Sequence, residues 1–337
     1  MASAGCEVLH NTVEKAAMIY NAFSHVGYYI SLIKQIKGYF QRNKVDLVIV
    51  CDSPAFNFHI AKAAKKAAIP TLFYVAPQLW AWAPWRLGKL RRCCDKLCCV
   101  LPFEQQWFTE RGIDSVFVGN PLLDNVGPDL SPYRRQYRDF RPETARVALL
   151  PGSRQAETKS LWPAMQRIAL RLKAVYSGLA FVTVAVDEGR KKFLRDNQID
   201  GFDCEYAIAS VTNTARMADL ALVASGSATL EVAAAGCPMV VMFQSNKVLW
   251  HLLGRWLIRI KHLCLVNILA GKELVPEFMP YFTSIGPIVD AAEELLGDRL
   301  RLSQISDELI NLTEPLARGS SAERTAEIAR QMLQRGV

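Results

Sequence analysis

The sequence lacks the glycine patterns by which many nucleotide-binding folds are recognised. Neither Gly-x-Gly-x-x-Gly nor Gly-x-x-x-x-Gly-Lys-Ser/Thr occurs in its 337 residues, which excludes the usual dinucleotide and P-loop sites. It also lacks an Asp-x-Asp triplet, and its five histidines are not paired as in metalloproteases. The residues therefore predict no metal site and no cofactor.

Long hydrophobic runs are missing as well. The longest apolar region, residues 217–243, is interrupted by Asp219, Glu231, Gly236 and Pro238. We therefore expect no membrane span, and any contact with a membrane should be peripheral. The first residues have neither the basic nor the apolar region of a signal peptide, which favours a cytoplasmic location.

Nine cysteines are present, and four of them, Cys93, Cys94, Cys98 and Cys99, share one short segment. A zinc site would need a second, distant pair of ligands, and no such pair follows in the sequence. Small buried residues flanking a strand explain the cluster better than a metal site does. Free thiols also fit a reducing cytoplasm.

Composition and charge narrow the classes of function. Hydrophobic residues make up 51% of the chain and charged residues 21%, which excludes global disorder. A net charge of +8 favours anionic partners, namely phosphorylated small molecules, acidic lipid or nucleic acid. The basic residues are scattered in ones and twos, and this speaks against nucleic acid.

Short strand-like runs alternate with helical segments in two series. The runs cover residues 45–50, 71–75, 97–101 and 115–118, then 146–150, 181–186, 220–224 and 239–243. Such alternation predicts an α/β fold of two facing Rossmann-like domains with parallel sheets. We expect an N-terminal domain over 1–140, a linker over 127–142, a C-terminal domain over 141–318, and a last helix over 319–337 that packs back on the N-terminal domain.

The first turn of chemical interest follows the strand at 146–150. Gly152 lets the backbone approach a ligand closely, Ser153 can donate a hydrogen bond, and the Arg154 guanidinium suits phosphate oxygens. These residues predict an anion site. An ordinary turn between strand and helix, with Arg154 in solvent, explains the segment equally well.

A second turn, after the strand at 220–224, is also made of small residues. The amides of Ser225, Gly226 and Ser227 are free at the start of a helix, where they can hold a diphosphate. Thr229 belongs to the same turn, and the Glu231 carboxylate, one helical turn onward, can accept both hydroxyls of a ribose. The alternative is a tight contact between helix and sheet that requires small side chains.

Asp52 directly follows the first predicted strand. Ligands of open α/β sheets bind outside the carboxyl ends of the strands, so we expect this carboxylate to face the cleft between the domains. There it can act as a general base. A role as the capping residue of the next helix is an equally good local explanation.

Basic residues recur at every fourth position in the segment 247–259: Lys247, His251, Arg255 and Arg259. A basic column beside Trp250 and several leucines suits an anionic lipid surface, so Trp250, Arg255 and Arg259 are candidate lipid contacts. A buried helix with one solvated face is the equal alternative. A second apolar set at helical spacing is better explained as core: Tyr29, Leu32, Ile33, Ile36 and Phe40.

Taken together, eight segments resemble lipid-A-disaccharide synthases. They are Cys-Asp-Ser-Pro-Ala-Phe-Asn (51–57), Tyr-Val-Ala-Pro with Leu-Trp-Ala-Trp (74–82), Leu-Pro-Phe-Glu (101–104), Val-Gly-Asn-Pro (118–121), and the segments 149–154, 225–231, 238–241 and 266–277. They stand in the family's order and cover nearly the whole chain.

The resemblance implies an inverting glycosyltransferase of GT-B type, a hexosyltransferase of lipid A biosynthesis. Such enzymes join UDP-2,3-diacylglucosamine to 2,3-diacylglucosamine 1-phosphate and release UDP. By match, Asp52 would deprotonate the acceptor hydroxyl, Arg154 would hold the diphosphate and Glu231 the ribose. Asn267 and Glu273 would line the donor side. The resemblance also implies a peripheral enzyme on the anionic inner membrane, and a homodimer is compatible with it.

Three departures from the family keep other functions open. Family members normally begin earlier, with a strand and a Gly-Glu-Ala-Ser-Gly-Asp turn, and Met1 aligns beyond it. Ala55 stands where the family has a second acid, and Asn120 stands where it commonly has histidine. A related UDP-sugar enzyme such as an epimerase, or an inactive nucleotide-sugar or lipid-binding remnant, is the alternative. The sequence predicts an exposed sheet edge if the first strand is missing.

Overall fold

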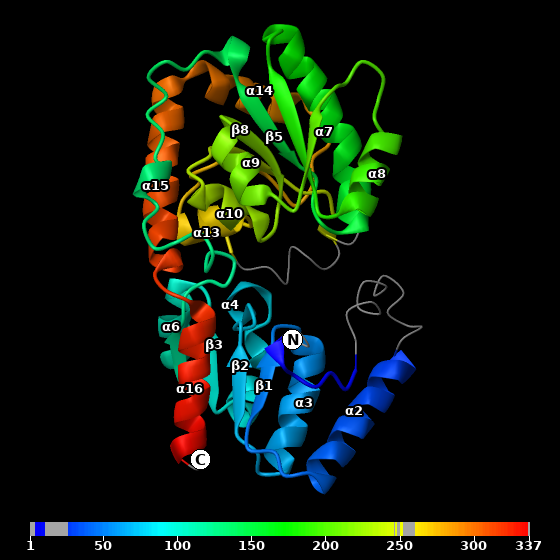
Figure 1. Ribbon diagram of the computed structural model, residues 1–337, viewed down its shortest axis with the longest axis vertical. Coiled ribbons are helices and arrows are strands. Elements are labelled where there is room, and N and C mark those ends of the chain that lie inside the picture. Colours follow the sequence, from blue (N-terminus) through cyan, green and yellow to red (C-terminus); the bar gives the residue numbers. More distant parts are fainter. Residues whose placement is uncertain (1–3, 11–25, 246, 248–249, 252–259, 336–337) are drawn as a thin grey trace.

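The chain folds into two lobes, which lie one above the other in Figure 1. A computed structural model describes residues 4–10, 26–245, 247, 250–251 and 260–335. Each lobe contains a parallel β-sheet with helices around it, so the predicted α/β fold with two parallel sheets is confirmed. Over these described ranges, no helix is both long and apolar enough to cross a membrane.

The N-terminal lobe is built on a four-stranded sheet with the order β1-β2-β3-β4. Its elements are α2 (Val26–Arg42), β1 (Val48–Cys51), α3 (Pro54–Lys66), β2 (Thr71–Tyr74), α4 (Leu79–Trp82), η3 (Pro84–Arg86), α5 (Leu87–Cys93), β3 (Lys96–Cys99), α6 (Pro102–Thr109) and β4 (Ser115–Phe117). Within the described residues β1 pairs on one side only, and the Ile49 side chain on this strand is 51% exposed.

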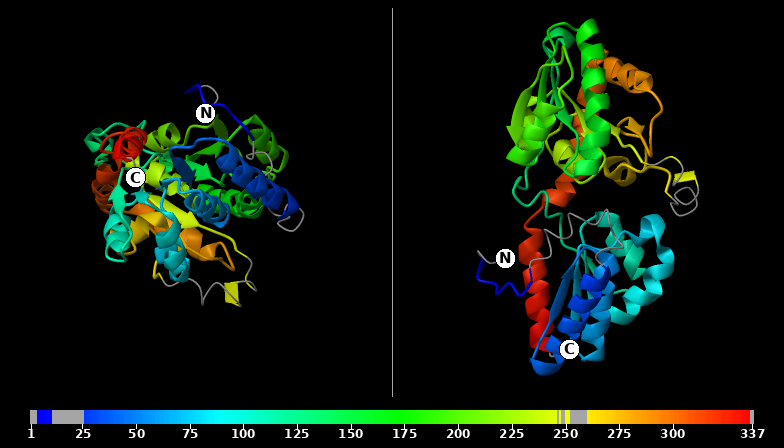
Figure 2. Two further views of the ribbon diagram at one scale, coloured as in Figure 1. Left: turned by 90° about the horizontal axis from the view of Figure 1, so that it is seen from below. Right: turned by 90° about the vertical axis from the view of Figure 1, so that its right-hand side faces the viewer.

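Alternate residues of the central strands face opposite sides of this sheet, as strand geometry requires. Phe73 and Leu97 pack with α3 and α5, and three of the five predicted core positions of α2, Ile33, Ile36 and Phe40, lie against the same cluster. Leu72 and Cys98 face the other side, where they meet Ala329 of the last helix, α16 (Ser321–Arg335). Figure 2 shows α16, in red, running along this lobe.

The C-terminal lobe carries a six-stranded parallel sheet with the order β10-β9-β8-β5-β6-β7. Its elements are η4 (Ser131–Tyr133), η5 (Pro142–Thr144), β5 (Arg146–Leu150), α7 (Gln155–Val175), β6 (Ala180–Ala185), α8 (Glu188–Asp196), β7 (Glu205–Ile208), α9 (Val211–Met217), β8 (Leu220–Ala224), α10 (Ala228–Ala234), β9 (Met239–Met242), α13 (Leu265–Ala270), β10 (Glu277–Phe278), α14 (Gly286–Gly297) and α15 (Arg299–Ala317).

The strand order of this sheet reverses at β5. The chain moves outward from β5 to β6 and β7, then returns to the other side of β5 with β8. All five residues of β8 are buried, as are four of the five residues of β5, which fits strands covered by helices on both faces. Ligands of open α/β sheets bind at such a reversal, outside the carboxyl ends of the two strands.

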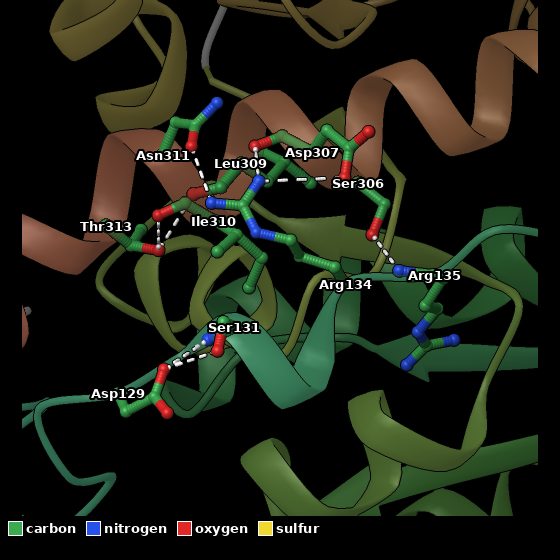
Figure 3. Close-up of polar contacts among 10 residues, drawn as sticks. All are labelled: Asp129, Ser131, Arg134, Arg135, Ser306, Asp307, Leu309, Ile310, Asn311 and Thr313. Carbon is green, nitrogen blue, oxygen red and sulfur yellow. Dashed lines mark hydrogen bonds and ion pairs between the residues drawn. The ribbon is translucent and has the colours of Figure 1, made fainter.

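The segment predicted as a linker, residues 127–142, lies along the C-terminal lobe. The Arg134 guanidinium donates to the Asn311 side chain at 2.6 Å and to the Asp307 carbonyl at 3.2 Å, both on α15 (Figure 3). Leu123 and Leu130 are fully buried in the C-terminal core. We therefore place the change of lobe near Gly119, which lies against Gly319 on the returning chain, rather than at residues 140–141.

Candidate active site

The two predicted turns lie side by side at the reversal of the C-terminal sheet. Leu150, the last residue of β5, pairs with Val223 of β8, so the residues that follow each strand are neighbours. Gly152 has φ 95°, and a Cβ at this position would lie 2.9 Å from an Oε2 atom of Glu157. Glycine is therefore required where the first turn passes the start of α7.

These turns enclose a cavity of about 280 Å³, which we call the donor cavity. Its lining includes Gly152, Ser153 and Arg154 of the first turn, Ser225, Gly226 and Ser227 of the second, and Glu231. Val184, Val186 and Val211 supply apolar walls at the ends of β6 and α9. The arrangement offers a polar end for an anion and an apolar slot for a flat ring.

Glu231 is half-buried in this cavity, and burial raises the pKa of its carboxyl above the usual range. The Thr212 hydroxyl donates to its Oε2 at 3.4 Å, which partly offsets the shift by favouring the charged form. Thr212 was not identified in the sequence, because it lies in α9, far from both turns. Nothing in its local pattern marks it as a partner of Glu231.

Arg154 joins the donor cavity to a larger one. Its side chain is 75% exposed and donates to Oε1 of Glu157 at 2.8 Å, and Arg154 lines both cavities. Arg190, at the start of α8, donates to the Ser153 carbonyl at 3.4 Å, and its buried Nε has no hydrogen-bond partner in the structure. Arg190 is thus a second cation beside the first turn, and the sequence analysis missed it.

The larger cavity, of about 930 Å³, lies between the lobes, and we call it the interlobe cavity. Asp52, Trp80 and Trp82 line it from the N-terminal lobe. Arg154 and residues 225–227 line it from the C-terminal lobe, together with a mainly apolar set: Leu230, Phe243, Trp250, Ile260, Leu263, Leu265, Ile268 and Met279. Asp52 and the two turns therefore line the same cavity from opposite lobes.

A left-handed turn presents Asp52 to this cavity. Asp52 and Ser53 have φ values of 48° and 41°, a conformation that costs energy outside glycine. The buried Asn57 side chain donates to the carbonyl of Cys51 at 2.8 Å and to that of Asp52 at 2.6 Å, which holds the turn. The Asp52 carboxylate is exposed and makes no hydrogen bond or ion pair within the described residues.

Three of the predicted substrate-binding residues lie outside both cavities. Thr229 is fully buried and donates to the Gly226 carbonyl at 2.7 Å. Asn267 is fully buried, and hydrogen bonds to the 274–277 segment occupy both atoms of its amide. Glu273 is exposed to solvent. The first two support the shape of the site, and the structure gives none of the three a ligand-facing position.

The remaining predictions divide between the cavity wall and the undescribed segment. Trp250 and Asn120 line the interlobe cavity, and the buried Asn120 donates to the Val100 carbonyl at 3.3 Å. Arg255 and Arg259 lie outside the described residues. In the part of the chain that the structure describes, no cluster of His, Cys, Asp or Glu side chains has the arrangement of a metal site.

The two parallel-sheet lobes, with a cavity between them, define the fold class of the protein as GT-B. Two solved structures share the fold. The S. aureus MnaA–UDP co-structure aligns with a TM-score of 0.62 at 17% identity, over 91% of this chain and 81% of that one. The UDP-GlcNAc 2-epimerase from Neisseria meningitidis bound to UDP-GlcNAc aligns at 0.58 and 12% identity, over 90% and 81%.

Sequence comparison gives the particular family. The model of the lipid-A-disaccharide synthetase family matches residues 1–332. The lipid-A-disaccharide synthase of Syntrophus aciditrophicus is 34% identical over 91% of this chain and 80% of its own. That of Geobacter metallireducens is 30% identical over 99% and 87%. The chain belongs to the lipid-A-disaccharide synthetase family and is a glycosyltransferase, which confirms the resemblance found in its motifs.

Proposed function

We propose that the chain joins UDP-2,3-diacylglucosamine to 2,3-diacylglucosamine 1-phosphate, forming lipid A disaccharide 1-phosphate and releasing UDP. One observation carries the proposal: Arg154 and the turn at 225–227 line both the donor cavity and the interlobe cavity, and Asp52 faces them from the other lobe. A donor whose diphosphate rests on these turns would place its sugar toward Asp52. Family membership supports the same activity.

The donor half would hold uridine diphosphate. The amides of Gly226 and Ser227 and the guanidinium of Arg154 would bind the diphosphate oxygens, and Arg190 adds a second positive charge nearby. The Ser225 amide, predicted from the sequence to be free, instead donates to the Met242 carbonyl at 2.9 Å. Glu231 would accept the ribose hydroxyls. As the bond between the donor sugar and the diphosphate breaks, these donors would stabilise the charge that develops on the leaving UDP.

The acceptor half would depend on Asp52. Its carboxylate would take the proton from the acceptor hydroxyl while that oxygen attacks C1 of the donor sugar. The bond from C1 to UDP breaks on the opposite face, so the configuration at C1 inverts. No cofactor takes part in this proposal, and the proton ends on Asp52.

The apolar wall of the interlobe cavity favours a lipid acceptor over a free sugar. Trp82 and Leu122 from one side, and Trp250, Ile260 and Leu263 from the other, surround space beside the donor cavity. Acyl chains bury well against such side chains. The substrates would reach the cavity from the anionic cytoplasmic surface of the inner membrane, on which the enzyme would act peripherally.

UDP release in the presence of both lipid substrates tests the activity. We expect Asp52→Asn to lower kcat by about 10²–10⁴-fold while the Kd for UDP stays unchanged, because Asp52 lies on the other lobe. Glu231→Gln should instead raise the Kd for UDP. Asp46→Asn, an exposed carboxylate paired with Lys44, is the matched control and should do neither.

Three results would contradict the proposal. An Asp52→Asn enzyme as active as the parent would remove the base. Turnover of UDP-N-acetylglucosamine alone, with no transfer to the lipid acceptor, would point to an epimerase instead. UDP binding without any turnover would mean that the chain is a binding remnant.

A further inference from the structure

A buried carboxylate lies in the wall of the interlobe cavity. Glu104 is 1% exposed, and both of its carboxylate oxygens accept hydrogen bonds. Oε1 accepts from the indole Nε1 of Trp80 at 2.9 Å, and Oε2 accepts from the amides of Val100 and Leu101 at 3.2 and 3.0 Å. Each of its three partners is a donor, which matches the acceptor-only chemistry of an ionised carboxylate.

Helix capping explains only part of this arrangement. Glu104 is the third residue of α6, and its bond to the Leu101 amide closes the start of that helix in the usual way. The bond to Trp80 is different, because it joins α6 to α4, which comes 24 residues earlier in the chain. A capping residue does not require a distant indole partner.

Trp80 is the more exposed of the two side chains in this network, all of which lines the cavity. Its half-exposed ring lines the interlobe cavity and packs edge-to-face on Phe103, with the ring centroids 4.9 Å apart and the planes at 81°. Phe103 thus fixes the ring from one side while Glu104 holds its N–H. The Asn120 amide, which also lines the cavity, donates to Val100 and joins the same wall.

We propose that the indole of Trp80 is the surface on which the acceptor sugar rests during transfer, and that Glu104 is the positioning residue that holds this indole in place. A fixed aromatic ring offers the apolar face of a pyranose a large contact at little entropic cost. The inference rests on the proposed function, because it assumes that the acceptor occupies the interlobe cavity.

The hydrogen bond from Trp80 to Glu104 is stronger in the ionised form, because a charged carboxylate is the better acceptor. A protonated carboxyl carries an O–H that would face one of three donors, and one of the bonds would be lost. Burial raises the pKa of Glu104 to about 7, so the bond should change within the neutral range. The titratable group that faces it is the Cys99 thiol, whose own pKa burial raises well above the usual range.

Indole ¹⁵N–¹H spectra of the unliganded protein test the contact itself. The Trp80 signal, assigned as the one lost in Trp80→Phe, should shift with a midpoint near pH 7 in the parent protein. In Glu104→Gln the same signal should stay constant across that range. A Trp80 signal that does not move with pH in the parent protein would overturn the proposed hold.

A double-substitution cycle on the KM for the lipid acceptor tests the role. Glu104→Gln should raise this KM about tenfold, the size expected for one lost hydrogen bond, with the Kd for UDP unchanged. In a Trp80→Phe background the same change should alter KM less than about twofold, because Glu104 acts through the indole. Glu110→Gln, an exposed glutamate just after the same helix, is the control and should match the parent.

The outcomes separate this inference from the proposed function. If the parent enzyme transfers to the acceptor and Glu104→Gln raises KM equally in both backgrounds, Glu104 serves only the fold and the inference fails alone. If the parent enzyme makes no transfer, both fail. If Glu104→Gln does not fold, Trp80→Phe remains decisive: an unchanged acceptor KM would show that the sugar does not rest on this ring.

Discussion

Asn267 is fully buried, and its side-chain amide makes four hydrogen bonds, two donated to Val275 and Glu277 and two accepted from the amides of Leu274 and Val275. Asn267→Ala would leave buried amides without partners, so we expect a loss of about 3 kcal/mol in the free energy of unfolding. Denaturant titration measures it, and the Kd for UDP of the folded protein should not change.

The exposed Glu273 provides the control for this prediction. Glu273→Ala should alter neither stability nor UDP binding, because no ligand-facing contact depends on it. If Asn267→Ala were instead fully stable and lost UDP, the donor-side role implied by the family resemblance would be correct and the structural role wrong.

Glu104 should make stability depend on pH in a defined direction. Because burial raises the folded-state pKa to about 7, this group contributes stability that is full below its unfolded pKa, about 4.3, and is lost as pH rises through about 7. Relative to Glu104→Gln, the parent protein should lose of the order of 3 kcal/mol between pH 4 and 8. Melting temperatures of both proteins across this range measure the difference, and parallel curves would exclude it.

The sequence identified the residues that follow strands and missed those that packing brings in. Asp52, Gly152 and Arg154 were found because each stands at the carboxyl end of a predicted strand, and the structure brings all three to a cavity. Thr212 and Arg190 come from other helices, so no local pattern marks them. The sequence does not reveal whether the amide of Asn267 is free to bind a ligand. In the structure, hydrogen bonds within the protein already occupy it.

The sequence predicted the strongly apolar strands correctly and did not predict the short or exposed ones. The predicted strands at 146–150 and 220–224 coincide with β5 and β8, because both are apolar apart from Arg146 at the start of β5 and both end at glycine or serine turns. The sequence analysis missed β7 and β10. β7 is a partly exposed edge strand, and β10 has two residues, so neither leaves a run long or apolar enough to identify.

Residues 127–142, which precede β5, are held on the C-terminal lobe by close backbone packing as well as by hydrogen bonds of Arg134 and Arg135. Gly236 has φ 62°, and a Cβ there would collide with the carbonyl oxygen of Tyr133. We expect Gly236→Ala to lower the free energy of unfolding by about 3 kcal/mol. Gly286→Ala, in open space at the start of α14, should change it by no more than about 1 kcal/mol.

Chemical denaturation of the two variants measures the contrast. A Gly236→Ala protein as stable as the Gly286→Ala control would mean that residues 131–133 move away at little cost. The segment would then be a tether, as the sequence predicted, rather than part of the C-terminal lobe.

At the scale of the whole molecule, the described part of the chain crosses between the lobes near Gly119 and again near Gly319. α16 then packs on the N-terminal sheet, and its start is capped by Asp124, which accepts from the Ser321 amide at 2.9 Å and from its hydroxyl at 2.7 Å. The sequence could predict two facing lobes from strand alternation. It could not predict which aromatic side chains line the space between them, because that depends on the relative orientation of the lobes, which these two connections determine.

The charge of the whole chain, +8, favours the proposed contact with an anionic membrane surface. Each Lys or Arg near an anionic bilayer contributes about 1 kcal/mol, and Trp250 of the same segment lines the interlobe cavity. We therefore expect Arg255→Gln with Arg259→Gln to weaken binding to phosphatidylglycerol-containing vesicles about thirtyfold. Co-sedimentation measures it, and added salt should weaken the parent protein's binding in the same way.

The control is Arg324→Gln with Arg330→Gln, which removes the same amount of charge from the exposed face of α16. It distinguishes an effect of the residues that contact the lipid from an effect of the net charge of the protein. If the basic column at 247–259 meets the lipid, this control should bind within about twofold of the parent, because charges beyond about 8 Å of the surface are screened at physiological salt. Equal weakening by both pairs would mean that only the overall charge acts. If the parent protein bound neutral phosphatidylcholine vesicles as strongly as phosphatidylglycerol-containing ones, electrostatic attraction would not explain the binding. An apolar contact that includes Trp250 would then be the explanation.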